Sequence, residues 1–64
     1  MPMSCRIVCS NELVFQDICD QLNLLQVLYL KEVERLEICV KRDPEYVSKF
    51  LLENGFEAHV LVHT

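Results

Sequence analysis

Residues 43–62 of the chain, DPEYVSKFLLENGFEAHVLV, carry its clearest structural signals. Asp43 is a residue type that caps helices, Pro44 suits the first helical position, and Gly55 stands where a left-handed residue would end a helix. After the glycine, from Phe56 to Val62, side chains alternate between two faces, as in a strand. The stretch therefore predicts a helix that begins at Pro44 and ends at Gly55, followed by a final strand.

The beginning of the chain predicts a strand and then a helix. Apolar side chains alternate over residues 5–9, which favours a strand whose odd-numbered residues share a face. Either Ser10 or Asn11 can cap the helix that follows, and Glu12 is favourable in its first turn. We expect this helix to end near Asn23.

The middle of the chain, residues 24–34, fits neither clean alternation nor a clean helical stripe, and two folds follow from it. One continues the first helix from Glu12 through this segment, to a length of about 34 Å, which is about twice that of the strands it would cover. The other places a strand at residues 25–31, a turn at 32–35 and a returning strand at 36–41. We favour this hairpin, because residues 36–41 alternate well.

The predicted order is therefore βαββαβ. The fold class is α+β, ferredoxin-like, with a four-stranded antiparallel sheet, two helices on one face and the first and third strands in the centre. The alternative is βαβαβ with one long first helix. We expect residues 1–64 to form a single small domain, ordered from about Ser4 to His63.

Composition excludes several classes of function. With 64 residues the domain has a thin core, which leaves little room for a deep pocket. We therefore expect no enzymatic activity and no cofactor. The net charge is −4 and the basic residues never form a run longer than two, which argues against nucleic acid as a partner. No stretch is long and apolar enough to span a membrane, and no secretory signal is visible. We therefore expect a cytoplasmic protein without a membrane partner.

The chain has four cysteines, Cys5, Cys9, Cys19 and Cys39. Each lies in an apolar, periodic segment, where a reduced cysteine behaves as a small hydrophobic residue. Disulfide scaffolds are rich in polar loops instead. We therefore expect reduced, mostly buried thiols.

The tail over residues 40–60, VKRDPEYVSKFLLENGFEAHV, resembles the second half of ACT domains, which are small regulatory domains. The resemblance implies an ACT-like, ferredoxin-like fold and a tendency to pair with another domain. Ligand sites of ACT domains usually depend on a glycine in the turn after the first strand, and residues 9–14 contain none. A small ligand is therefore not expected.

The same tail is similar to heavy-metal-associated domains, which bind a soft ion through Cys-x-x-Cys after the first strand. Here the spacing is Cys5-x-x-x-Cys9, which in a strand separates the thiols by about 13 Å. If this segment were a loop, the two thiols could converge on one ion. Our alternative hypothesis is therefore a small-ligand or soft-metal binding domain. Its candidate ligands are Cys5, Cys9, Cys39, His59 and His63.

The sheet face opposite the helices is the most informative predicted surface. From the second strand it receives either Leu28 and Leu30 or Val27 and Tyr29, depending on register. Exposed apolar residues gathered on so small a domain indicate a contact surface. We therefore predict a non-enzymatic regulatory or interaction module that binds a protein partner, or itself as a homodimer, through this face or a sheet edge. The predicted partner-binding residues are Val8, Leu28, Leu30, Cys39, His59, Leu61 and His63.

Overall fold

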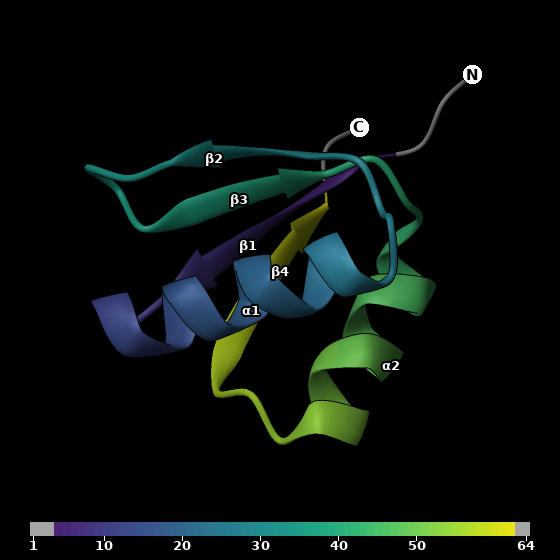
Figure 1. Ribbon diagram of the computed structural model, residues 1–64. Helices are drawn as coiled ribbons and strands as arrows, with labels where there is room; N and C mark the ends of the chain where they lie inside the picture. The colour runs from purple at the N-terminus through teal and green to yellow at the C-terminus, as the bar shows by residue number, and fades with distance from the viewer. Residues whose placement is uncertain (1–3, 63–64) are drawn as a thin grey trace.

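Six elements follow one another along the chain in a computed structural model, which describes residues 4–62. They are β1 (Cys5–Cys9), α1 (Glu12–Leu24), β2 (Tyr29–Glu32), β3 (Glu37–Val40), α2 (Pro44–Asn54) and β4 (Ala58–Val62). The strands form one antiparallel sheet in the order β2-β3-β1-β4 (Figure 1). The α+β class and the central position of the first and third strands are thus confirmed.

The core lies between the sheet and the two helices, which lie on the same side of it (Figure 1). Ile7 of β1 stands between Ile38 of β3 and Val60 of β4, and these paired residues share one face. Ile7 and Ile38 are fully buried, and Val60 is half-buried against the core. The helices contribute Phe15, Ile18, Cys19 and Leu22 from α1 and Val47, Phe50 and Leu51 from α2.

Helix α1 ends where the shorter of the two predictions placed it. The Asn11 side chain accepts a hydrogen bond from the Val14 N–H at its start, and Leu25 caps its end. Gln26 then takes a left-handed φ of 58°, which stops the helix. The alternative with one long helix is therefore wrong. The predicted start of the second strand at Leu25 is also wrong: because residues 25–26 complete the helix terminus, β2 begins at Tyr29.

The hairpin between β2 and β3 is confirmed, but its turn lies one residue later than predicted. The Arg35 N–H donates to the Glu32 carbonyl and the Leu36 N–H donates to that of Val33. Leu36 has a φ of 55°, so it belongs to the turn and not to a strand. Strand β3 is consequently shorter than predicted and runs from Glu37 to Val40.

Helix α2 has the predicted caps at both ends. The Asp43 side chain accepts from the Tyr46 N–H, and Gly55 has a φ of 70°. The Phe56 N–H donates to the carbonyl of Leu51, and the Phe56 ring packs against Phe50 at 5.8 Å between centroids. Since Phe56 takes part in this cap, β4 begins at Ala58, two residues after the predicted start.

Candidate functional site

The side of the sheet away from the helices, here called the open face, is set by the strand register. Arg6 in the central strand β1 lies between Cys39 of β3 and Leu61 of β4. The next pairing on this face joins Val8 to Glu37 and to His59. Because paired residues share a face, all of these side chains lie opposite the core.

The register also decides which residues β2 contributes. Leu30 pairs with Cys39, and the Lys41 N–H donates to the Leu28 carbonyl, so Leu28 and Leu30 lie on the open face. Their exposed fractions are 76% and 64%. Val27 is buried instead, and Tyr29 is half-buried on the core side. Of the two predicted pairs, the structure therefore places the leucines outside.

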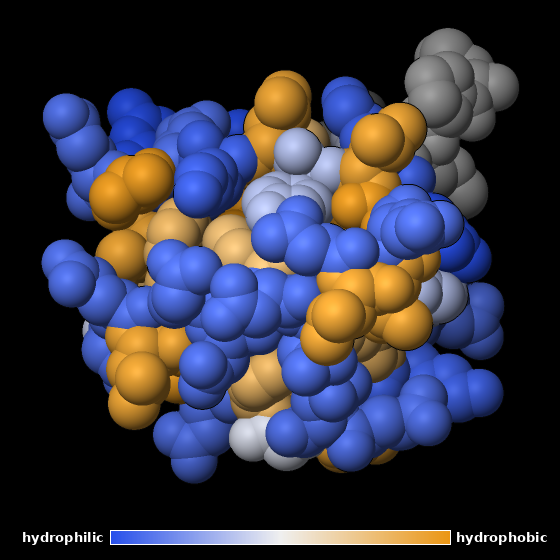
Figure 2. All heavy atoms as spheres, viewed as in Figure 1, coloured by the Kyte–Doolittle hydropathy of each residue, from blue (hydrophilic) through white to orange (hydrophobic). Residues whose placement is uncertain are grey.

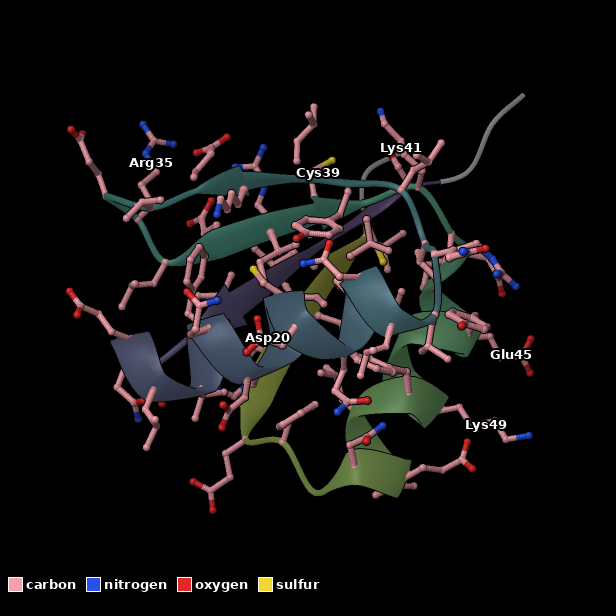
Figure 3. The ribbon with its side chains drawn as sticks, viewed as in Figure 1. Asp20, Arg35, Cys39, Lys41, Glu45 and Lys49 are labelled. Carbon is pink, nitrogen blue, oxygen red and sulfur yellow. The ribbon has the colours of Figure 1, made fainter. Side chains whose placement is uncertain are left out.

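Apolar residues of this face, which we call the open-face patch although Arg6 lies between Cys39 and Leu61, are the following: Val8, Leu28, Leu30, Cys39 and Leu61. Val8 and Cys39 are half-buried, and the three leucines are each more than half exposed. Figure 3 shows Cys39 and Lys41 rising from the hairpin on the side away from α1. On the helix side, shown in Figure 2, apolar areas are interrupted by polar side chains.

Charged residues of the open face neutralise one another. An Arg6 guanidinium nitrogen lies 2.8 Å from a Glu37 carboxylate oxygen and 3.9 Å from one of Glu32. Arg35 adds a contact of 4.0 Å to Glu32. The Arg6 and Glu37 side chains are only 25% and 19% exposed. The pair was not predicted, because Arg6 and Glu37 become neighbours only once the register of β1 and β3 is known.

The candidate metal ligands of the alternative hypothesis are divided by the sheet. Cys5 and Cys9 face the core and are buried, whereas Cys39 and His59 lie on the open face. His63 lies outside the described residues. Burial raises the pKa of the Cys5 and Cys9 thiols, which disfavours the thiolate that a metal needs. Over residues 4–62, no three potential ligand side chains come together in a metal-binding group.

Strand β4 forms a free edge of the sheet, because within residues 4–62 it pairs only with β1. Its sequence, Ala-His-Val-Leu-Val, contains neither a proline nor an Asp, Glu, Lys or Arg. Leu61 is 52% exposed on the open face, and Val62 is 58% exposed on the opposite, helix side. Exposed apolar side chains thus project from both faces of this edge.

Comparison with known proteins yields no match: no family model, no curated protein and no solved structure matches the chain. Among the described residues, no helix is both long and apolar enough to cross a membrane. Function is therefore inferred from the open face and the free edge of the sheet.

Proposed function

We propose that the chain is a non-enzymatic regulatory or interaction module that binds another protein through its sheet, with a second copy of itself as the first partner. The observation that carries this proposal is the open-face patch, in which Leu28, Leu30 and Leu61 are 76%, 64% and 52% exposed. Leu28 and Leu30 lie on the β2 edge and Leu61 lies on the β4 edge, and exposed apolar side chains on one face of a small domain mark interaction sites. Covering it with protein removes the leucines from water, which is favourable.

Charge does not oppose a second copy at the sheet. The chain has a net charge of −4, so two copies repel one another over most of their surface. On the open face, however, Arg6 and Lys41 balance Glu32 and Glu37. Strand β4 has no formally charged side chain. The sheet therefore offers the surface on which two acidic chains meet with the least repulsion.

The finer assignment of the fold belongs to the same proposal. We propose a ferredoxin-like domain of the ACT-like kind, supported by the βαββαβ order and by the central β1 and β3. The buried free thiols of Cys5, Cys9 and Cys19 support a reducing compartment such as the cytoplasm.

The test compares Leu61→Glu, on the sheet, with Leu52→Glu, an exposed position on α2, by analytical ultracentrifugation under reducing conditions. We expect the wild type and Leu52→Glu to dimerise, and Leu61→Glu to weaken the dimer roughly tenfold or more, because it places a charge at the contact. Circular dichroism confirms that each variant is folded. A wild type that stays monomeric up to about 1 mM, or a Leu61→Glu dimer as tight as the wild type, would contradict the proposal.

A further inference from the structure

We propose that the outer face of helix α1 is a second docking surface, which binds a basic amphipathic helix of another protein. This surface lies on the helix side of the molecule, so the inference goes beyond the proposed binding through the sheet and does not depend on it. Three observations carry it: the position of two exposed leucines, a groove beside one of them, and the charge of the helix.

The first observation is a line of exposed residues along α1. Its members recur every three or four residues and therefore share one face of the helix: Leu13, Asp17, Asp20 and Leu24. The two leucines are 73% and 75% exposed and stand at the two ends of the line, about 16 Å apart along the helix axis. Neither belongs to the core. Both are therefore available for apolar contacts with a partner on this face.

The second observation is a groove of about 630 Å³ between α1 and the hairpin of β2 and β3. Leu13 lines the groove together with Val33 of the hairpin turn, which is 59% exposed. Phe15, which is buried, and Leu36, which is half-buried, add further apolar surface to its lining. An apolar side chain that enters the groove leaves water, which is favourable. The groove therefore offers a position for one anchoring side chain of a partner.

The third observation is the charge of α1, which contains Glu12, Asp17 and Asp20 but no Lys, Arg or His. These carboxylates are exposed, and no basic side chain of residues 4–62 lies within 4.0 Å of them. Lys31 is the one basic residue among those that line the groove. Figure 3 shows Asp20 on the exposed side of α1, and Figure 2 shows hydrophilic residues over the helix with hydrophobic areas near its ends. The face is therefore acidic in its middle and apolar at both ends.

The acidic middle of this face discriminates between partners. It attracts basic side chains, whereas nucleic acid and anionic lipid carry the same sign of charge and are repelled. A second copy is disfavoured there too, because each chain would bring three carboxylates to the contact. Two helices packed side by side meet along their length, so a helix can contact both leucines at once. The partner that fits has apolar residues about three turns apart and Lys or Arg between them.

Fluorescence anisotropy with a labelled probe peptide tests the inference. The probe is a helix of about 15 residues with leucine on one face and lysine and alanine elsewhere, and a control probe has glutamate in place of lysine. We expect the wild type to bind the lysine probe with a Kd below about 100 μM at low salt, more weakly as salt is added, and not to bind the glutamate probe. No binding of the lysine probe up to about 1 mM would overturn the inference.

Two double variants of equal net charge separate this face from a general attraction to an acidic protein. Asp17→Lys/Asp20→Lys reverses two charges on α1, and Glu53→Lys/Glu57→Lys reverses two exposed charges elsewhere. We expect the α1 variant to bind the lysine probe roughly tenfold or more weakly, and the matched variant to stay within about threefold of the wild type. Circular dichroism confirms that both are folded. Equal losses in the two variants would show unspecific attraction and overturn the inference.

The apolar contribution is tested with Leu13→Ala, and Leu52→Ala is the control because Leu52 is 81% exposed on α2. We expect Leu13→Ala to weaken probe binding about threefold or more, and Leu52→Ala to leave it unchanged. A Leu13→Ala variant that binds as tightly as the wild type would overturn the assignment of the groove. The proposed dimer is judged separately: a monomeric wild type that binds the probe contradicts self-association through the sheet and leaves this inference standing.

Discussion

Arg6 lies on the open face, but its environment differs from that of an ordinary surface arginine. It sits in the central strand, 25% exposed, with Glu37 at 2.8 Å. Its Nε atom is buried and has no hydrogen-bond partner among the described residues. The guanidinium therefore depends on Glu37 for compensation of its charge, while the more exposed Glu32, at 3.9 Å, contributes little.

We predict that Glu37→Gln destabilises the domain by about 1–2 kcal/mol, because it leaves a partly buried arginine without its charged partner. Glu32→Gln is the matched control, since Glu32 is 46% exposed and its ion pair is long. We expect it to change stability by less than about 0.5 kcal/mol. Urea unfolding of both variants measures the difference. Equal effects would show that Glu37 has no special role.

At the scale of the elements, a residue with positive φ follows each helix, but the two residues differ in kind. Gly55 after α2 has a φ of 70°, a conformation that glycine adopts without cost. Gln26 after α1 has a φ of 58°, which carries a steric cost for a residue with a Cβ. The end of α1 is therefore strained where the end of α2 is relaxed.

We predict that Gln26→Gly stabilises the domain by about 0.5–1 kcal/mol, since relief of the strain exceeds the entropy that glycine adds to the unfolded chain. Gln26 is exposed, so little packing is lost. Gly55→Ala provides the converse and should cost about 1 kcal/mol from the backbone alone, because a Cβ there meets nothing within 4 Å. Thermal or urea unfolding checks both; a Gln26→Gly variant less stable than the wild type would refute the account.

The same contrast explains how far sequence reasoning reached. The ends of α2 are indicated by residue types that favour helix termini, namely Asp43, Pro44 and Gly55, and α2 was predicted correctly. Gln26 follows α1 and Leu36 precedes β3, each with a positive φ that its residue type does not predict. The bounds of β2 and β3 were therefore misplaced. The open-face residues of β1, β3 and β4 followed from alternation. The residues that β2 contributes and the Arg6–Glu37 contact needed the register, which a single strand does not encode.

At the scale of the whole molecule, three of the four thiols are part of the core. Cys5, Cys9 and Cys19 are 0%, 7% and 1% exposed, as expected from their apolar segments. Burial raises the pKa of each above the ordinary value of 9.0. The folded state thus holds these thiols protonated at a pH where the unfolded chain releases their protons.

We predict that stability is insensitive to thiol ionisation below about pH 9 and falls as the pH rises from there through the raised values. A group whose pKa is higher in the folded state favours folding only while the unfolded state also keeps its proton. The loss is at most about 1.4 kcal/mol per pH unit for each thiol. Urea unfolding between pH 7 and 10 under reducing conditions measures it. In Cys5→Val, the free energy of unfolding should fall less steeply with pH, by the contribution of one thiol. An unchanged slope would assign the loss of stability at high pH to other groups.

The central position of β1 has a consequence for synthesis. β1 pairs with both β3 and β4. It is translated first, but one of its two edges stays unpaired until β4, the last described strand, has been made. Such non-local pairing slows folding relative to helical domains. Until β4 is in place, the chain exposes one backbone edge of β1 and part of its apolar core, and partly folded chains of this kind are prone to aggregate.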